Sequence, residues 1–419
     1  MKQKTAVVGF GCAGYHGVKA MREHGYNGEI DVYTDSLWAP ANPMLTTYYI
    51  YGKLPKEATR PFGTLDELAE KYEFHTVNGQ VQKVLSEEKS IRMKDGRIER
   101  YDQILIATGA RAFLPPVEGL DCKNVFPMRT MEDAGRVKKV LEEKEIHSAV
   151  VVGASMVGIK LVELFHARGI KCTLADMAPG IFPIAAVPCI ASEIERRLKE
   201  KGVDLAFSRA LQRIEEADGR RQVVFAGAER ISCDLVMMCI GTRANTQLVD
   251  EKLRVNRGIV VDGQMRTNMP DIYCAGDCSE GTNLQTKETQ IIGIWDNAAK
   301  QGRTAGANMA GVRTVYQGNM LHNITHFMGM DFIGYGDVRS EGREYLYENR
   351  ELGQKFFLRM GDAGPVCMNF LDSYKASGAL KSYMLRKING NAQTLSPVER
   401  VRMIREGIPE DLTELLMKD

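Results

Sequence analysis

The feature that most constrains this chain is a strand, a glycine-rich loop, a helix and a second strand that follow one another twice. In the first copy, the apolar run 5–9 leads into Gly9–Gly14, a helical pattern, and the short apolar run 30–34. In GxGxxG the first glycine permits a tight turn, the second lets the backbone approach a pyrophosphate, and the third allows helix and strand to pack closely. The helix N-terminus then faces the phosphates, and an acid about 20 residues further on accepts ribose hydroxyls. The residues expected to bind this first dinucleotide are Gly9, Gly11, Gly14 and Asp35.

The second copy begins with the apolar run 148–152 and continues through Gly153–Gly158 into a helical pattern and the run 171–175. Ser155 replaces the second glycine, and its small side chain is tolerable at that point of the loop. Two such units in one chain indicate two dinucleotides, one of which can be a bound flavin and the other a diffusing nicotinamide nucleotide. The residues expected to bind the second dinucleotide are Gly153, Gly158 and Asp176.

Composition excludes several other classes of protein. Lys and Arg number 55 against 54 Asp and Glu, and this net charge of +1 gives no support for a nucleic-acid or anionic-membrane binder. No uncharged run reaches the ~20 residues that a membrane span needs. The nine cysteines form neither a CxxC nor a zinc or cluster spacing, which fits reduced thiols in a cytoplasmic protein. His322 and His326 have the spacing of metal ligands on one helical face, but no third ligand is near, so no metal is expected.

Further segments indicate which dinucleotide binds where. The stretch 101–111 resembles the "ATG" segment of two-dinucleotide flavoproteins, and 234–246 resembles the matching segment that closes the NAD domain. The stretch 272–278 resembles the second FAD fingerprint, whose aspartate, here Asp277, holds the flavin ribityl chain in that family. The stretch 295–303 resembles the following helix, which caps the isoalloxazine. The order of these motifs resembles that of the FAD-dependent pyridine nucleotide–disulfide oxidoreductase superfamily. Within it, the chain is most similar to the ferredoxin-reductase, nitrite-reductase and NADH-oxidase branch.

The resemblance implies an α/β fold of the glutathione-reductase type, with two Rossmann-like domains, one for FAD and one for NAD, and a C-terminal α+β interface domain. It divides the chain into residues 1–111 (FAD-binding, first part), 112–246 (NAD-binding), 247–321 (FAD-binding, second part) and 322–419 (interface). It also implies a nicotinamide-nucleotide contact at Gly241. The further residues expected at FAD are Val81, Thr108, Gly109, Arg111, Gly276 and Asp277.

Two departures from the family pattern bear on the chemistry. Disulfide-reducing, peroxidase and coenzyme A branches carry cysteine shortly after the first acidic residue, but the stretch 38–48 has none, which excludes a thiolate relay there. This stretch looks like the "RPxLSK" segment of the ferredoxin-reductase branch, with Asn42 in place of its arginine and Thr47 in place of its lysine. The second helix usually reads Gly-x-Glu, and here Lys160 stands at the glutamate position. Lys160 is either a cation near flavin N5 or a surface lysine, and with Trp295 it is a candidate for the flavin environment.

The two cysteines beside the second FAD fingerprint are expected to be structural. Cys274 would point into the strand core, and Cys278 would be a small residue beside the flavin. A redox pair is the other interpretation of their spacing.

These features predict an enzyme that passes a hydride between a nicotinamide nucleotide, NAD(H), and FAD, with the protein supplying positioning and electrostatics. Since the chain has neither a thiol relay nor a cluster, electrons leave FAD directly. The leading expectation is a ferredoxin-like or iron–sulfur partner protein or subunit, as in flavin subunits of anaerobic complexes that oxidise phenylglyoxylate and other 2-oxoacids. The chain would then act in a homo-oligomer or a hetero-complex. The alternatives are a free-standing NADH oxidase that reduces oxygen and an NADH-responsive, flavin-bound scaffold. Basic residues expected to form a rim for an acidic partner are Lys375, Lys381, Arg386 and Lys387.

Overall fold

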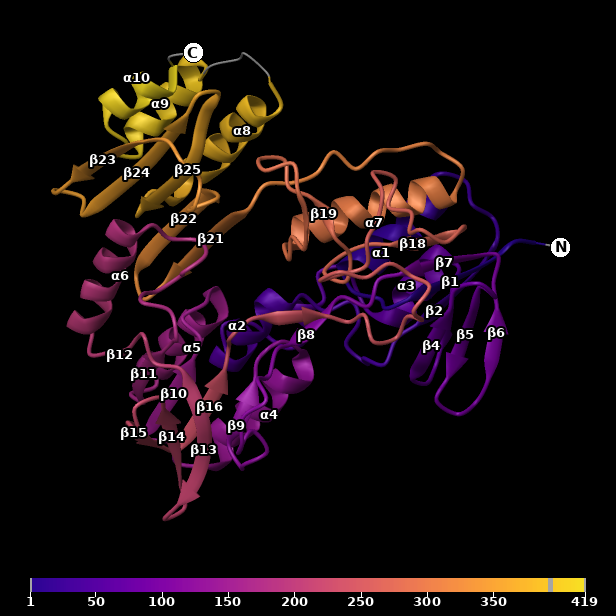
Figure 1. Ribbon diagram of the computed structural model, residues 1–419, viewed down its shortest axis with the longest axis horizontal. Helices are drawn as coiled ribbons and strands as arrows, with labels where there is room; N and C mark the ends of the chain where they lie inside the picture. Colours follow the sequence, from indigo (N-terminus) through magenta and orange to yellow (C-terminus); the bar gives the residue numbers. More distant parts are fainter. Residues whose placement is uncertain (1, 391–394, 418–419) are drawn as a thin grey trace. The chain divides into compact units, whose positions relative to one another are not determined.

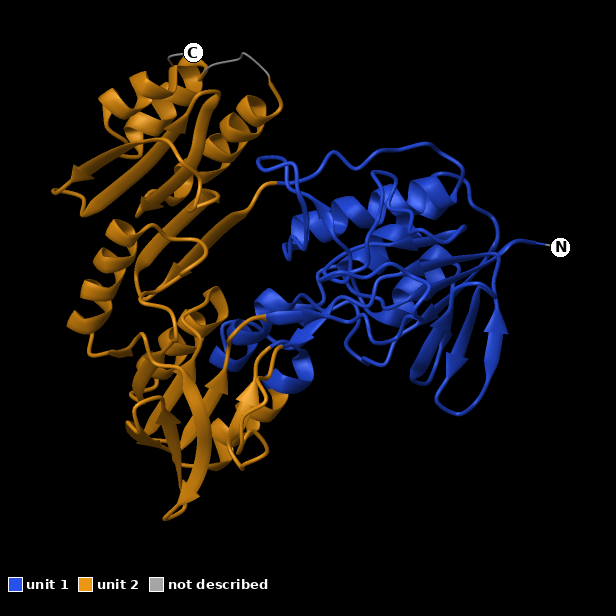
Figure 2. Cartoon of the chain, in the orientation of Figure 1, with its two compact units in different colours: residues 1–112, 129–134, 242–319 blue, residues 113–128, 135–241, 320–419 orange. Residues whose placement is uncertain are grey.

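The computed structural model describes residues 2–390 and 395–417, which form two compact units (Figure 2). Unit 1 consists of Met1–Ala112, Arg129–Ala134 and Thr242–Asn319, and unit 2 consists of Phe113–Met128, Gly135–Gly241 and Met320–Asp419. The chain therefore passes between the units several times. The C-terminal segment belongs to the same unit as the second glycine-rich loop, whereas the division into four domains stays a prediction.

A parallel five-stranded sheet forms the centre of unit 1, with the strand order β18-β7-β1-β2-β3 (Figure 1). The buried positions of its strands are mostly apolar because both faces of the sheet are covered. The two strands predicted around the first glycine loop are confirmed as β1 and β2. The strands are β1 (Lys4–Val8), β2 (Glu29–Tyr33), β3 (His75–Val77), β7 (Gln103–Ile106) and β18 (Ile272–Cys274).

Helices cover one face of this sheet and a small antiparallel sheet covers the other. Side chains alternate along each strand, so Val7 packs in the cluster that contains α1 and α7 residues, whereas Ala6 and Val8 pack in the cluster that contains β4 and β5 residues. The helices of unit 1 are α1 (Cys12–Glu23), α2 (Thr46–Tyr51), α3 (Leu65–Tyr72) and α7 (Trp295–Met309), with 3-10 turns η1 (Pro43–Leu45) and η2 (Glu57–Thr59). The remaining strands are β4 (Val81–Leu85), β5 (Ser90–Met93), β6 (Ile98–Arg100), β8 (Ala110–Ala112), β17 (Thr242–Ala244), β19 (Gly281–Thr282) and β20 (Thr289–Gln290).

Unit 2 contains a second parallel sheet, with the strand order β12-β11-β10-β16-β9. The strands predicted around the second glycine loop are confirmed as β10 and β11. A three-stranded antiparallel sheet, β13-β14-β15, packs its apolar residues against one face. The strands are β9 (Val125–Pro127), β10 (Ser148–Val152), β11 (Lys171–Ala175), β12 (Asp204–Ala206), β13 (Leu211–Ala217), β14 (Arg220–Phe225), β15 (Arg230–Cys233) and β16 (Leu235–Met238). The helices are α4 (Met131–Glu143), which begins in unit 1, α5 (Met156–Ala167) and α6 (Pro188–Glu200).

The C-terminal part of unit 2 is an antiparallel sheet with the order β21-β22-β25-β24-β23 and helices on one face. The predicted α/β fold with an α+β C-terminal part is thereby confirmed. His322 and His326 lie in strand β21, so their spacing does not place them on a helical face. The elements are β21 (His322–Phe327), β22 (Met330–Gly336), β23 (Arg343–Asn349), β24 (Gln354–Gly361), β25 (Gly364–Leu371), η3 (Tyr374–Ala376), α8 (Ser377–Ile388), α9 (Pro397–Arg405) and α10 (Glu410–Met417).

Two candidate features are absent from the described ranges 2–390 and 395–417. No helix there has the length and apolar character needed to cross a membrane. No group of three or more His, Cys, Asp or Glu side chains there could hold a metal ion.

Glycines set the distance between α1 and α7. A Cβ atom on Gly306 would lie 2.2 Å from the carbonyl oxygen of Gly17, and one on Gly302 would lie 2.3 Å from that of Ala13. Both distances are far below van der Waals contact, so the helix axes approach more closely than alanine would allow. The predicted close packing of the first helix is thus completed from a segment almost 300 residues later in the chain.

We predict that Gly306→Ala lowers the unfolding free energy by about 1–3 kcal/mol, because the added methyl overpacks a backbone contact. Gly135→Ala is the matched control: Gly135 is also helical, but nothing lies within 4 Å of its added Cβ. That variant should gain about 0.5–1 kcal/mol from helix propensity. Thermal unfolding of both flavin-loaded variants measures the difference, and equal melting temperatures would contradict the packing argument.

Candidate dinucleotide-binding sites

The first glycine loop forms a cradle at the carboxyl end of β1. Gly9 has φ +97°, and a Cβ atom on it would lie 2.3 Å from the carbonyl oxygen of Ala107. A Cβ on Gly14 would lie 2.2 Å from the carbonyl oxygen of Gly9. Gly11 is the N-cap of α1, and nothing lies within 4 Å of its added Cβ. The loop is therefore closed toward the protein and open at the helix N-terminus, where a pyrophosphate would fit.

Two residues predicted at FAD lie at strands of unit 1. Asp35 is exposed and follows the end of β2. Val81 is half-buried in β4, where it packs against the core of that side of the sheet. Their contacts with FAD stay predictions.

The "ATG" segment is hydrogen-bonded to the segment with which the chain re-enters unit 1. Thr108 Oγ1 donates to the carbonyl oxygen of Asn245 at 2.9 Å, and Asn245 Nδ2 donates to the carbonyl oxygen of Thr108 at 2.9 Å. Arg111 lies in β8, which pairs with β17, and its Nη1 donates to Gln247 Oε1 at 2.8 Å. Gly109 has φ +64°, which lets the backbone turn between these contacts. These residues therefore hold the two connecting strands together next to the first glycine loop.

Asp277 is held by an arginine that sequence reasoning missed. Asp277 Oδ2 accepts from Arg129 Nη2 at 2.6 Å, and the two side chains are only 13% and 25% exposed. Its other oxygen, Oδ1, has no hydrogen-bond partner within the described part of the chain, so it can accept from a ligand hydroxyl. Gly276, with φ +87°, donates its N–H to Gln301 Oε1 at 2.9 Å, which fixes the preceding turn. The free carboxylate oxygen suits the predicted bond to the flavin ribityl chain.

Arg129 is positioned by its own local sequence. The Asp133 carboxylate accepts from the N–H groups of Arg129 at 3.0 Å and Thr130 at 2.9 Å, while Thr130 Oγ1 accepts from the Asp133 N–H at 3.1 Å. The pattern Thr-x-x-Asp at a helix start is a capping signal that the sequence does show. The capping pattern could have located the helix start, but not the pairing of Arg129 with a residue 148 positions away.

Trp295 begins α7 and belongs to an aromatic stack. Its ring lies 5.8 Å from that of Phe62 with an 18° interplanar angle, and Phe62 stacks on Tyr15 at 4.0 Å and 7°. The neighbouring His16 is desolvated by burial, and with a second contribution from Arg303 its pKa is lowered to about 4. Trp295 is therefore supported by neutral, planar neighbours, and its role beside the flavin stays a prediction.

The second glycine loop repeats the geometry of the first. Gly153 has φ +116°, and its added Cβ would lie 2.3 Å from the carbonyl oxygen of Cys239. A Cβ on Gly158 would lie 2.0 Å from the carbonyl oxygen of Gly153. Ser155 caps α5: its Oγ accepts from the Gly158 N–H at 3.2 Å and donates to the Cys239 carbonyl at 2.9 Å. The serine thus has a structural reason to replace the second glycine. Gly241, predicted at the nicotinamide nucleotide, has φ +107°.

Asp176 lies directly after β11 and reaches back to the second glycine loop. Its Oδ2 accepts from the Ala154 N–H at 2.7 Å, and its Oδ1 accepts from the Ala178 N–H at 2.8 Å. Two backbone donors fix the orientation of this carboxylate. The Asp176 carboxylate therefore lies next to the second glycine loop, where the predicted contact with the ribose would have to form.

Lys160 is not a surface lysine. Its side chain is 11% exposed, forms an ion pair with Glu163 on the same helix, and donates to the carbonyl oxygen of His326 at 2.6 Å. These contacts connect α5 to strand β21 within unit 2. Its predicted place near flavin N5 stays a prediction.

The predicted site residues fall into two sets. Within each unit, most of them lie at the carboxyl ends of parallel strands or in the loops beside them, whereas Val81 and Arg111 lie in β4 and β8 and Lys160 and Trp295 lie in α5 and α7. Unit 1 contains Gly9, Gly11, Gly14, Asp35, Val81, Thr108, Gly109, Arg111, Gly276, Asp277 and Trp295, and unit 2 contains Gly153, Gly158, Lys160, Asp176 and Gly241.

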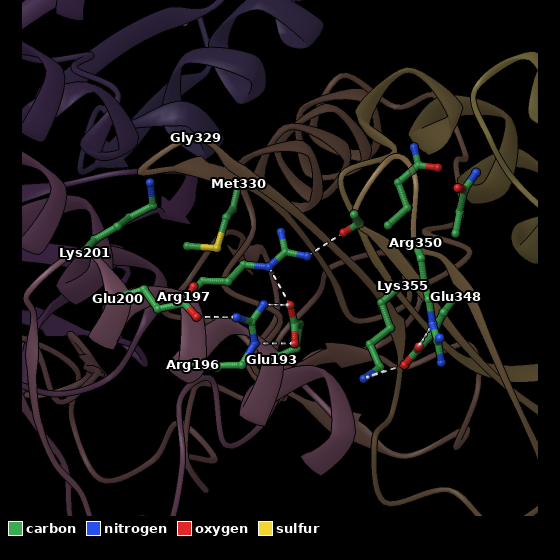
Figure 3. Close-up of a pocket in the computed structure, with 13 residues that line it drawn as sticks. Glu193, Arg196, Arg197, Glu200, Lys201, Gly329, Met330, Glu348, Arg350 and Lys355 are labelled. Carbon is green, nitrogen blue, oxygen red and sulfur yellow. Dashed lines mark hydrogen bonds and ion pairs between the residues drawn. The ribbon is translucent and has the colours of Figure 1, made fainter.

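A separate cavity of about 600 Å³ lies in unit 2 between α6 and the strands β22–β24 (Figure 3). Several of its charged side chains pair with one another. Arg196 contacts both Glu193 and Glu200, and Lys355 Nζ lies 3.0 Å from Glu348. None of the predicted site residues lines it.

Comparison with known proteins decides the family. The model of the family "Pyridine nucleotide-disulphide oxidoreductase" matches residues 3–302. The chain belongs to this family. It is an FAD-dependent NAD(P)H oxidoreductase, and its cofactors are FAD and NAD(H). The predicted family, enzyme class and cofactors are confirmed.

Several relatives are similar over most of their length. An NADH oxidase of Methanocaldococcus jannaschii is 28% identical over 327 residues, which are 75% of this chain and 71% of that protein. A rubredoxin-NAD(+) reductase of Pseudomonas putida is 28% identical over 315 residues, 74% of this chain and 80% of that protein. The epsilon subunit of NADH-dependent phenylglyoxylate dehydrogenase of Aromatoleum evansii is 25% identical over 391 residues, 92% of each chain. Among solved structures, the covalent putidaredoxin reductase–putidaredoxin complex matches with a TM-score of 0.85 and 20% identity, covering 99% of each chain, which shows the shared fold.

We predict that Asp277→Ala weakens FAD binding about 10–100-fold. The substitution removes a charge-assisted acceptor of about 1.5–3 kcal/mol and leaves the largely buried Arg129 without its carboxylate. Asp95→Ala is the control, because Asp95 is an exposed residue of the β5–β6 hairpin whose ion pair with Arg97 is also exposed. Equilibrium dialysis of FAD from both variants measures the effect. Equal retention of FAD would show that Asp277 does not contact it.

We predict that the protein prefers NADH to NADPH and that Asp176→Ala reduces this preference. A 2′-phosphate of about −1.5 to −2 charge would face the Asp176 carboxylate. At ~4 Å and an effective dielectric of ~20, each unit charge pair costs roughly 4 kcal/mol before screening, and even half of that exceeds tenfold discrimination.

The control for Asp176 is Asp204→Ala in the neighbouring strand β12, where the carboxylate is 55% exposed and pairs with Lys171. Comparing kcat/KM for the two nucleotides in both variants tests the assignment. Equal kcat/KM for NADH and NADPH in the unsubstituted protein would overturn it.

Proposed function

We propose that this protein passes electrons between NAD(H) and an iron–sulfur protein or subunit, with FAD as the carrier between them. The observation that carries the proposal is the absence of cysteine from residues 38–48, where thiol-active members of the family keep their redox cysteine. The cysteines that the chain does contain are buried or half-buried in the structure, so no exposed thiol is present to relay electrons to a partner. Electrons must therefore pass from FAD to an external acceptor.

The relatives support an iron–sulfur acceptor. Rubredoxin-NAD(+) reductase is named for an electron-carrier protein, and the phenylglyoxylate dehydrogenase epsilon subunit belongs to a multi-subunit enzyme. The latter matches over 92% of both chains, including the C-terminal part beyond the family match. We propose that the chain serves as the flavin subunit of a 2-oxoacid-oxidising complex of this kind. NADH oxidases among the relatives support the second candidate, direct reduction of oxygen.

The residues of this chain would bind and orient the cofactors. The N-termini of α1 and α5 would receive the two pyrophosphates through backbone N–H groups, of which Ser155 already caps one in α5. Asp277, held by Arg129, would fix the ribityl chain, and Asp176, held by two backbone N–H groups, would fix the nicotinamide-side ribose. FAD, when bound, accepts two electrons as a hydride and can return them singly. Lys160 and Trp295 would shape the flavin environment without transferring a proton.

The basic rim proposed for an acidic partner is smaller than the sequence indicates. Arg386 lies 3.0 Å from Glu399, and both side chains are 22% exposed, so its charge is already neutralised. Lys381 Nζ lies 3.1 Å from His322 Nε2. Lys387 is half-buried, whereas Lys375 is 76% exposed and its ion pair with Glu406 is loose, at 3.8 Å. Lys375 is therefore the rim residue best placed for long-range steering.

We predict that the FAD-loaded protein reduces a ferredoxin or rubredoxin with NADH much faster than it consumes oxygen. Added salt should slow electron transfer to the ferredoxin or rubredoxin, because it shortens the ~10 Å screening length. Lys375→Gln should slow that reaction and weaken its salt dependence. Lys171→Gln is the control, because Lys171 is equally exposed at 73% and also forms a loose ion pair, at 3.3 Å. Stopped-flow absorbance under anaerobic conditions and an oxygen electrode measure the two reactions. Oxygen consumption as fast as reduction of any dye or ferredoxin would favour the NADH oxidase.

A further inference from the structure

Helix α7 (Figure 1) carries two buried amide side chains one turn apart, Asn297 and Gln301. They are 1% and 0% exposed, so both amides are removed from water. A buried amide costs free energy unless its polar atoms find hydrogen-bond partners. The partners of these two amides show which segments of the chain they hold.

Gln301 holds the turn that precedes Asp277. Its Oε1 accepts from the Gly276 N–H at 2.9 Å and lies 3.2 Å from the Ser279 hydroxyl, which also lies 2.9 Å from the Gly276 carbonyl oxygen. Its Nε2 is buried and has no hydrogen-bond partner within residues 2–390 and 395–417. The amide of Gln301 is therefore used through its oxygen, and this oxygen binds the N–H of the residue directly before Asp277.

Asn297 holds the chain on the other side of Asp277. Its Nδ2 donates to the Ile292 carbonyl oxygen at 3.0 Å, and its Oδ1 accepts from the Tyr316 hydroxyl. The next residue, Gly293, lies against the Asp277 side chain, because a Cβ atom on it would be 3.8 Å from the carboxylate carbon. The two segments beside this carboxylate are thus bound to one helix by amides four residues apart.

We propose that Gln301 is a positioning residue for FAD, with Asn297 supporting it from the preceding turn of the helix. By binding the Gly276 N–H, Gln301 fixes the turn that directs the free oxygen of Asp277 at the ribityl chain. Asn297 keeps segment 292–293 against the same carboxylate. The proposal rests on the predicted contact between Asp277 and FAD, and it does not depend on which acceptor receives the electrons.

A purely structural role for Gln301 would lower the stability of the protein but not the FAD affinity of the folded state. Asn308 provides the matched control, because it lies on the same helix and is 7% exposed. It is seven residues beyond Gln301, about 10 Å along the helix axis. Its Nδ2 donates to three carbonyl oxygens, none of them in segments 276–279 or 292–293: those of Gln264, Thr304 and Thr314.

The test is equilibrium dialysis of FAD from the full-length, FAD-loaded variants, at a temperature at which circular dichroism shows each variant to be folded. Gln301→Met keeps the length of the side chain but removes the acceptor, and we expect it to weaken FAD binding about tenfold. Gln301→Asn withdraws the oxygen by one methylene group and should also weaken binding, so it replaces Gln301→Met if that variant does not fold. Asn308→Leu should lower the melting temperature without weakening FAD binding.

Two further variants separate positioning from packing. Gln301→Glu keeps an acceptor oxygen at this place, and burial favours its neutral carboxyl group, so it should bind FAD nearly as the unsubstituted protein does. If Gln301 acts through Asp277, Gln301→Met should cause no further loss when it is combined with Asp277→Ala, because the two substitutions remove the same interaction.

Three results would each overturn the role of Gln301: unchanged FAD affinity in Gln301→Met, an equal loss in Gln301→Glu, or additive losses in the double variant. If Asp277→Ala itself retains FAD, the predicted contact of Asp277 with FAD is wrong, and this proposal is wrong with it. None of these results bears on whether an iron–sulfur protein or oxygen is the acceptor, which the stopped-flow comparison decides separately.

Discussion

The close approach of backbone to backbone at two glycine pairs is the constraint on which the rest of the structure depends. A side chain at Gly14 or Gly158 would meet the carbonyl oxygen of Gly9 or Gly153 at 2.2 or 2.0 Å. Each helix can therefore begin directly above its strand, with its N-terminus directed at the place where a dinucleotide phosphate would bind. Because this geometry occurs once in each unit, the chain is built for two dinucleotides, and electron transfer between them is the function that follows.

The acidic groups at these sites are fixed by different means, although the two loops are alike. Asp176 is held by the backbone N–H group of Ala178, two residues later, and by that of Ala154 in the second glycine loop. Asp277 is held by a distant arginine, and its second oxygen is left for a ligand. We propose that Asp176 contacts the nicotinamide nucleotide with a carboxylate whose orientation is already fixed before the nucleotide binds. We propose that Asp277 binds FAD through the oxygen that Arg129 leaves unused.

Features that depend on residues close together in the chain could be predicted from the sequence. Contacts between distant segments could not. The two loops and their strands could be predicted because their signals lie within a few tens of residues. These signals are the glycine spacing, the small side chain of Ser155 and the acids after β2 and β11. The Arg129–Asp277 pair and the contact of Lys160 with the His326 carbonyl join distant segments. The i, i+4 spacing of His322 and His326 fits a strand face as well as a helix face, and only the pairing of β21 with β22 decides between them.

The central claim is that electrons pass from NADH to FAD and leave without a thiol intermediate. Stopped-flow reduction by NADH, followed by electron transfer to a dye, tests it most directly in the protein with every cysteine replaced. We expect this variant, when folded and loaded with FAD, to reduce its flavin and to pass electrons to the dye at the rates of the unsubstituted protein. Loss of either step in the folded, FAD-loaded variant would contradict the claim.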